Sequence, residues 1–153
     1  MSLKVNDKVW RKLKSRLAML GRKDASVKVG VLEGSGEHDG GFSMVELAAV
    51  HEFGSPANNI PSRSFIRATF VNNREEAARV LQRLAKGIVT NKLEVDQALG
   101  VLGLWGANAV KRYITSGKVV PPLKPATIAR KGSSKPLVDT GQLVNSITWK
   151  VVA

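Results

Sequence analysis

The sequence predicts an α+β fold in which several helices pack with a small antiparallel sheet. Apolar residues recur at helical spacing in the segments 6–21, 77–88 and 93–114, and two short segments, 26–32 and 146–152, alternate in the manner of strands. Hydrophobic residues make up 43% of the 153 residues, which is enough for one core without metal or disulfide support. We therefore expect one domain over the whole chain, residues 1–153.

The N-terminal part, residues 1–24, is expected to form a basic amphipathic helix. Asn6 or Asp7 can cap this helix and Gly21 can end it, and its apolar positions are Val9, Trp10, Leu13, Leu17 and Leu20. Lysines and arginines occupy the other side. Such a basic face can touch phosphate or lipid head groups or can simply face solvent, and the sequence leaves both interpretations open.

A strand over 26–32 leads into a glycine-rich acidic loop, 34–41. The glycines in this loop do not have the spacing of a dinucleotide-binding turn, and its acidic residues would repel a pyrophosphate, so we expect a plain connecting loop. Ser43 and Glu46 then form a capping box, in which each side chain satisfies a backbone donor at the helix start. The box predicts a helix over 45–53.

Residues 55–62 have the composition of a loop, with prolines and asparagines. Ser62 or Ser64 can cap the helical stretch that follows, because a hydroxyl oxygen accepts from the free backbone donors of a first turn. Phe65 and Ile66 are expected in the core.

Two longer helices follow the asparagine pair 72–73, which can break the preceding helix. The first covers 77–88 and is amphipathic, and the second covers 93–114. Glycine inside a helix costs about 1 kcal/mol against alanine. We therefore expect a close approach of another element at the three glycines of the second helix, Gly100, Gly103 and Gly106.

The C-terminal part begins with an extended loop, 117–138, rich in proline, lysine and serine. This loop carries a charge of +5 with no acidic residue, and a helical turn is possible at 126–130. A loop of this length without elements of its own is usually functional or becomes ordered on a partner. A turn at 139–141, a short helical piece through Leu143 and the last strand complete the chain.

Charge is distributed unevenly along the chain. The net charge is +12, with +7 over 1–30, −5 over 31–61, +5 over 62–92, −2 over 93–110 and +7 over 111–153. Segregated charge suits head-to-tail association of copies, and head-to-tail contacts that close make rings. The same pattern can also serve solubility alone, and the net charge keeps a non-catalytic DNA-binding protein as the alternative function.

Few residues suit catalysis or metal binding. The chain has no cysteine and two histidines, and the pairs His38–Asp39 and His51–Glu52 fit no common metal site. The tripeptide 139–141, Asp-Thr-Gly, occurs once, whereas an aspartic protease needs two such carboxylates. We expect no enzyme, no cofactor and no metal. No apolar run reaches the length of a signal peptide or a membrane span, so we expect a soluble protein made in the cytoplasm.

Two separated segments then point to a family. The first signature comprises residues 49–55 (AVHEFGS) and 60–68 (IPSRSFIRA), and the second comprises 123–132 (LKPATIARKG) and 136–147 (PLVDTGQLVNSI). Their order and separation resemble bacteriophage neck and tail-completion proteins, a minor-tail and virion-morphogenesis group. Ser64 stands where this family often has proline.

The resemblance implies a structural virion protein of a tailed phage or prophage. Such a subunit forms a ring, which we expect to be a hexamer, at the head–tail junction, completes the tail and joins it to the capsid. It implies assembly in the bacterial host cytoplasm and contacts with a tail terminator, tail tube or head-completion protein. It implies no catalysis. The net charge of +12 is compatible with non-specific contact with DNA in the channel.

The residues of the signatures have physical interpretations. Glu52, Phe53 and Gly54 end a helix, with Phe53 as an anchor and Gly54 free to take a positive φ. Pro61 fixes the entry to the next helix, and Phe65 goes to the core. In the second signature, Asp139 or Thr140 is expected to cap a helix, with Gly141 in the turn.

Six basic residues are candidates for contact with a neighbouring subunit or partner. Arg63 and Arg67, predicted to lie one helical turn apart, can bind a carboxylate or phosphate of another subunit, or can be solvated or paired within the chain. The full set is Arg63, Arg67, Lys124, Arg130, Lys131 and Lys135.

Overall fold

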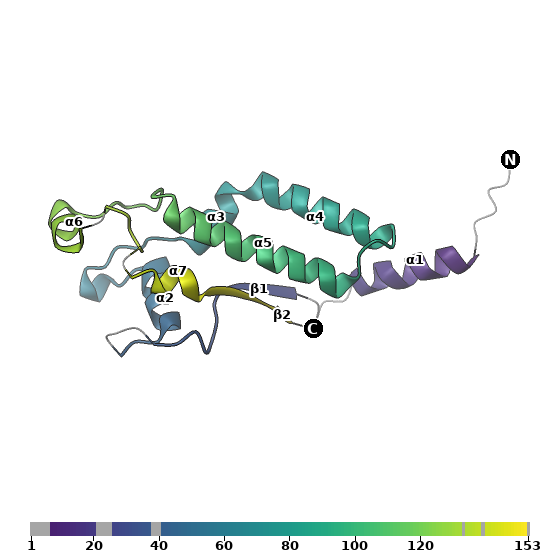
Figure 1. Ribbon diagram of the computed structural model, residues 1–153, viewed down its shortest axis with the longest axis horizontal. Helices are drawn as coiled ribbons and strands as arrows, with labels where there is room; N and C mark the ends of the chain where they lie inside the picture. Colours follow the sequence, from purple (N-terminus) through teal and green to yellow (C-terminus); the bar gives the residue numbers. More distant parts are fainter. Residues whose placement is uncertain (1–6, 21–25, 38–40, 133, 139, 153) are drawn as a thin grey trace.

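The computed structural model describes residues 7–20, 26–37, 41–132, 134–138 and 140–152. It confirms the α+β class: several helices pack with one two-stranded antiparallel sheet (Figure 1). In chain order the elements are α1 (Asp7–Leu20), β1 (Ser26–Val31), α2 (Met44–Phe53), the 3-10 helix η1 (Pro56–Asn58), α3 (Ile66–Asn72), α4 (Arg74–Val89), α5 (Val95–Thr115), α6 (Pro125–Lys131), α7 (Gln142–Ser146) and β2 (Ile147–Val152).

The two strands lie far apart in the sequence and pair with Ser26 opposite Val152 and Val31 opposite Ile147. Helix α5 runs along one face of this pair (Figure 1). An added Cβ at Gly103 would lie 2.5 Å from Cε3 of Trp149 on β2. The expected close approach at this glycine is therefore confirmed, because the indole lies directly against the backbone of α5.

The core lies where α5 meets the sheet and the segment before α3. Its most deeply buried large side chains are Phe65, Val110, Ile114 and Ile147. The expected burial of Phe65 is confirmed.

Helices α3 and α4 are separate, as the asparagine pair predicted. Asn73 stands between them, and its side-chain Nδ2 donates to the Thr69 carbonyl at 2.7 Å. Trp105 on α5 holds α4 in place, because its Nε1 donates to Glu76 Oε1 at 3.0 Å. Glu76 also lies 3.8 Å from the Arg112 guanidinium.

The extended loop expected over 117–138 is not one uninterrupted loop. Helix α6 occupies its middle, at the place where the sequence allowed a helical turn. Val119, in the first part of the segment, is buried in the core, so this part of the segment is anchored to the body. The predicted cap by Asp139 or Thr140 is corrected: Gly141 (φ 81°) is the N-cap of α7 and has no side chain to cap it, while Thr140 Oγ1 only accepts from Gln142 N–H at 3.4 Å. Asp139 lies outside the described residues.

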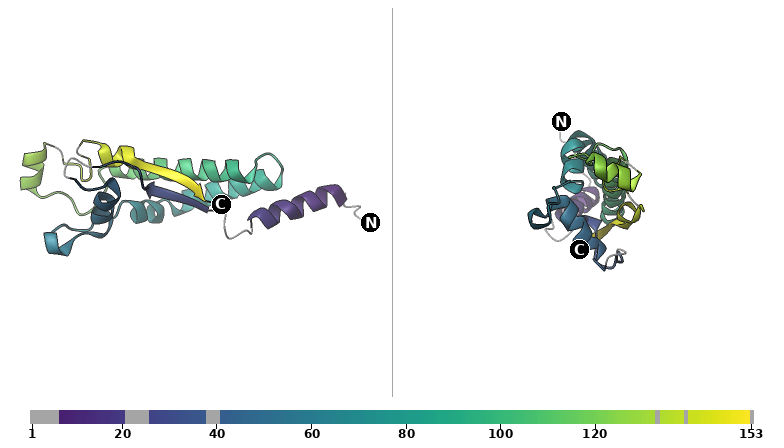
Figure 2. Two further views of the ribbon diagram at one scale, coloured as in Figure 1. Left: turned by 90° about the horizontal axis from the view of Figure 1, so that it is seen from below. Right: turned by 90° about the vertical axis from the view of Figure 1, so that its left-hand side faces the viewer.

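The molecule is elongated, and its ends are made by different elements. Helix α1 lies within the predicted segment 6–21. It extends beyond the body at one end, next to α4, while α2 and α6 lie toward the other end (Figures 1 and 2). The predicted apolar positions of α1 other than Trp10 have side chains outside the described part. No helix in the described ranges is long and apolar enough to cross a membrane.

Candidate assembly site

Glu52 joins the last turn of α2 to the first turn of α3. Its carboxylate accepts four hydrogen bonds: Oε1 from the Ser64 hydroxyl at 2.6 Å and from Arg67 N–H at 3.1 Å, and Oε2 from the N–H groups of Phe65 and Ile66 at 2.8 and 2.9 Å. The free donors of a helix start are thus satisfied by a side chain from another helix. The carboxylate is the N-terminal cap of α3.

This arrangement corrects the predicted cap. Ser62 and Ser64 do not cap α3; instead, their hydroxyls donate to Glu52, Ser62 to its carbonyl at 2.9 Å and Ser64 to its carboxylate. Glu52 itself is only 6% exposed. Burial by itself raises the pKa of the Glu52 carboxyl, but the hydrogen bonds from Ser64, Ile66, Arg67 and Phe65 outweigh it and hold the pKa below its usual value.

Gly54 makes the tight turn that brings the two parts of the first signature together. Its φ is 81°, as a C-terminal glycine was predicted to adopt, and its N–H donates to the Val50 carbonyl at 2.8 Å. A Cβ here would lie 2.8 Å from the Ser62 nitrogen. Ser55 and Ile60 then pair through N–H to carbonyl bonds of 2.9 and 3.0 Å, which close the loop between them.

Arg63 connects the first signature to the segment before α6. Its Nε donates to the Pro121 carbonyl at 2.9 Å, and its backbone N–H donates to the His51 carbonyl at 2.7 Å. The side chain therefore has an intrachain contact, one of the two roles the sequence left open. Arg63 precedes α3, so it is not one helical turn from Arg67, which lies inside α3 and is exposed.

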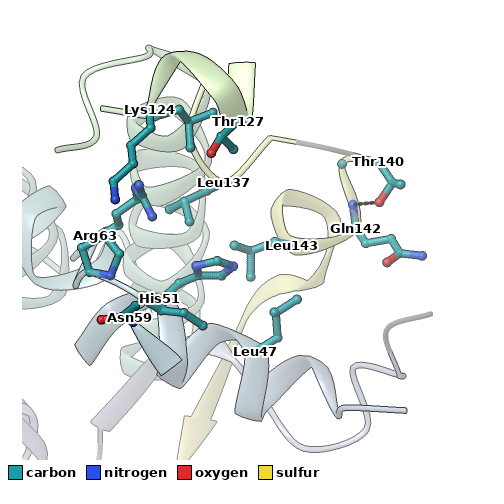
Figure 3. A pocket seen from close by; sticks show the side chains of 14 residues that line it. Leu47, His51, Asn59, Arg63, Lys124, Thr127, Leu137, Thr140, Gln142 and Leu143 are labelled. Carbon is teal, nitrogen blue, oxygen red and sulfur yellow. Dashed lines mark hydrogen bonds between the residues drawn. The ribbon is translucent and has the colours of Figure 1, made fainter. Parts of the chain in front are cut away.

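A cavity of about 500 Å³ lies where the two signatures meet (Figure 3). Side chains of α2 and the 59–63 segment form one wall, and residues of α6, α7 and the turn before α7 form the other. Arg63 and Lys124 both line it, together with Pro61, Thr140 and Gly141 of the predicted motif set. Among its described lining residues, Arg63 and Lys124 are basic and none is acidic.

The remaining predicted contact residues are not all brought to this cavity. Lys135 is exposed and outside the lining, and the side chains of Arg130 and Lys131 lie beyond the described part of the chain. His51 lines the cavity while Glu52 faces α3, so these neighbours point to different surroundings. In the described residues, no cluster of three or more His, Cys, Asp or Glu side chains suits a metal ion.

The outer face of α2 is a second surface, and sequence analysis missed it. Val45, Ala49 and Phe53, spaced four residues apart, lie on this face and are exposed, with Phe53 at 73%. They form one side of an apolar groove of about 350 Å³, together with Ala48, Val31, Ile66 and the edge residues Glu52 and Arg67. The expectation that Phe53 is an anchor within its own chain is wrong, because its ring points outward.

The missed surface had a signal in the sequence. Helix α2 reads MVELAAVHEF, in which apolar residues occupy both sides, and its inner face buries Met44 and Ala48. A helix that is apolar all round is normally covered on all sides. The body of this chain covers only one side of α2.

Comparisons with protein-family models, with curated proteins and with solved structures found no match for this chain. The resemblance to phage neck proteins therefore depends on the two sequence signatures alone.

Proposed function

We propose that this chain is a structural virion protein of a tailed phage or prophage, a ring-forming neck or tail-completion subunit at the head–tail junction. The observation that supports this function best is the exposed apolar face of α2, centred on Phe53. Exposed apolar stripes beside a groove are typical of surfaces that bind another protein. A subunit that works by assembly needs such a surface.

The positions of the signature residues add support. Residues of both signatures line one cavity, and Glu52, Gly54 and Arg63 each hold together segments that would otherwise separate. These contacts build a rigid platform beside α2. In this role the signature residues maintain a shape, and no turnover of a substrate is involved.

The partners in this proposal are other copies of the chain, in a closed ring that we take to be a hexamer, and neighbouring tail-terminator, tail-tube or head-completion proteins. Assembly takes place in the bacterial host cytoplasm and ends in the virion. The net charge of +12 also permits non-specific contact with DNA in a central channel.

The test is the protein composition of purified particles. Virions of the phage or induced prophage that encodes the chain are purified through a density gradient, and the chain is quantified by mass spectrometry against the tail-tube protein. We expect a fixed copy number that corresponds to one ring per particle. Absence from particles, together with retention on a DNA column that falls steeply with salt, would instead support the free DNA-binding alternative.

A further inference from the structure

We propose that the cavity between the two signatures binds a carboxylate of a partner protein, carried by an acidic residue that stands next to apolar residues. Arg63 and Lys124 bind the carboxylate, and the apolar walls of the cavity receive its neighbours. This inference rests on the proposed function, because it names the chemistry by which the chain holds a neighbouring virion protein.

The first observation is that two cations from distant parts of the chain share one cavity. Arg63 precedes α3 and Lys124 precedes α6, and both line the cavity. Figure 3 shows the Lys124 side chain running from the α6 end of the cavity toward Arg63. Two like charges in one cavity repel each other, and a bound anion relieves that repulsion.

The second observation is that neither charge is neutralised within the described chain. No carboxylate among the described residues forms an ion pair with Arg63 or Lys124. Arg63 Nε donates to the Pro121 carbonyl at 2.9 Å and Nη2 donates to the Pro122 carbonyl at 3.5 Å. A guanidinium has more N–H donors than these two bonds use, so donors remain for a ligand. The intrachain bonds orient Arg63 without exhausting it.

The third observation is that the backbone under Lys124 is restrained. Prolines at 121, 122 and 125 fix their φ angles, and Pro125 is the first residue of α6, with Lys124 as its N-cap. The bonds from Arg63 hold the same segment from the other side. A restrained segment loses less conformational entropy when a ligand binds.

The fourth observation is the apolar lining, which decides the kind of anion. Leu47, Leu137 and Leu143 line the cavity with the two cations, and Leu137 and Leu143 are buried (Figure 3). An apolar wall only removes water from a bare phosphate, which costs free energy, whereas it stabilises the apolar neighbours of a side-chain carboxylate. The cavity of about 500 Å³ has room for a short peptide segment of this kind.

The experiment titrates the purified chain with the peptide acetyl-Leu-Glu-Leu-amide and follows backbone amide chemical shifts. The matched control is acetyl-Leu-Gln-Leu-amide, which has nearly the same shape and no charge. We expect saturable shifts at cavity residues such as Leu47, Thr127 and Gly141. The glutamine peptide should bind about tenfold more weakly, as for the loss of hydrogen bonds to charged groups.

A pair of lysine variants tests which cation binds the peptide. Lys124 is exposed, so Lys124→Met should leave the Tm unchanged and should weaken binding of the glutamate peptide about fivefold, as for the loss of an exposed ion pair. The control is Lys118→Met, because Lys118 is also exposed in the segment before α6 and does not line the cavity. Its affinity for the peptide should equal that of the wild type.

Three results would overturn the site: no saturable binding of the glutamate peptide, equal affinities for the two peptides, or full affinity in Lys124→Met. Inorganic phosphate is titrated in parallel as a free anion. Phosphate that shifts the same amides and binds more tightly than the glutamate peptide would overturn the choice of a protein carboxylate.

The outcome can be separated from that of the proposed function. A chain that is present in particles but does not distinguish the two peptides would overturn the carboxylate site and leave the virion role intact. A chain that binds the glutamate peptide as expected but never enters particles would support the site and overturn the virion role.

Discussion

The two sides of helix α2 differ in what their side chains contact. The inner side buries Met44, Ala48 and Glu52, and every oxygen of the Glu52 carboxylate is used. The outer side presents Val45, Ala49 and Phe53 to solvent. One helix of ten residues thus packs one face into the fold and leaves the other face exposed.

This difference predicts that substitutions on the two sides of α2 have different effects on stability and assembly. A change on the inner side should unfold or loosen the protein, because it removes core packing at Met44 and Ala48 or leaves buried donors without partners at Glu52. A change on the outer side should leave stability within about 0.5 kcal/mol of the wild type, as is usual for exposed positions, and should affect assembly alone.

The largest effect is expected at Glu52. Glu52→Gln replaces one carboxylate oxygen with an NH₂ group, so at least one backbone N–H at the start of α3 loses its acceptor. We expect the free energy of unfolding to fall by about 3 kcal/mol, as for the loss of a buried charged acceptor. Urea denaturation measures it.

The control for this substitution is Glu46→Gln, in the exposed capping box at the other end of α2. Glu46 also accepts a backbone donor, from Ser43 at 2.9 Å, but it does so in solvent. Its effect should be clearly smaller. Equal losses at the two positions would show that the inner side of α2 is not special.

The second prediction concerns pH. The pKa of Glu52 is lower in the folded chain than its ordinary value of 4.5, so the folded state favours the charged form. The stabilisation that charged Glu52 gives the folded chain is therefore complete above pH 4.5. It is lost as the pH falls through the lower pKa that Glu52 has in the folded chain.

This pH dependence should be specific to Glu52. Between pH 6 and pH 3, the wild type should lose more stability than Glu52→Gln, so the difference between them shrinks as the pH falls. Parallel stability curves for the two proteins would contradict the assignment.

The third prediction compares two glycines of α5, one in close contact with Trp149 and one with more space around it. Gly103→Ala places a Cβ 2.5 Å from the Trp149 ring, whereas at Gly100 the nearest Trp149 atom is 3.5 Å away. Crowding should cost about 2 kcal/mol at Gly103, while Gly100→Ala should gain up to about 1 kcal/mol of helix propensity. Opposite shifts in Tm check it; shifts of the same sign would not fit this packing.

The fourth and smallest effect is expected at Arg63. Arg63→Lys keeps the charge but removes the Nε donor that bonds Pro121. We expect a loss of about 1 kcal/mol, the usual worth of such a bond, and faster amide exchange at Val119 and Val120. Unchanged exchange would mean that Arg63 does not hold this segment.

Much of the fold followed from the sequence, because local signals and tertiary packing agree there. The capping box of Ser43 and Glu46, the strands at 26–32 and 146–152 and the break at Asn73 all depend on neighbours in the chain. The glycine at 103 was also informative, because its cost in a helix implied a close contact.

The roles of Glu52 and Phe53 could not be predicted in the same way. A cap is normally sought in the residues just before a helix. Glu52 is well separated in sequence from the start of α3, and the turn at Gly54 brings the two together in space. The direction of Phe53 depends on which side of an apolar helix meets the core. That choice is made by tertiary packing, which periodicity does not record when both sides are apolar.

One measurement tests the central claim, that the outer face of α2 serves assembly and not the fold. Phe53→Asp is introduced into the phage or prophage that encodes the chain, the variant chain is quantified in purified particles by mass spectrometry, and the free energy of unfolding of the purified variant is measured in urea. We predict a free energy of unfolding within about 0.5 kcal/mol of the wild type and a loss of the chain from particles of about tenfold or more. Normal incorporation of the variant into particles would contradict the account.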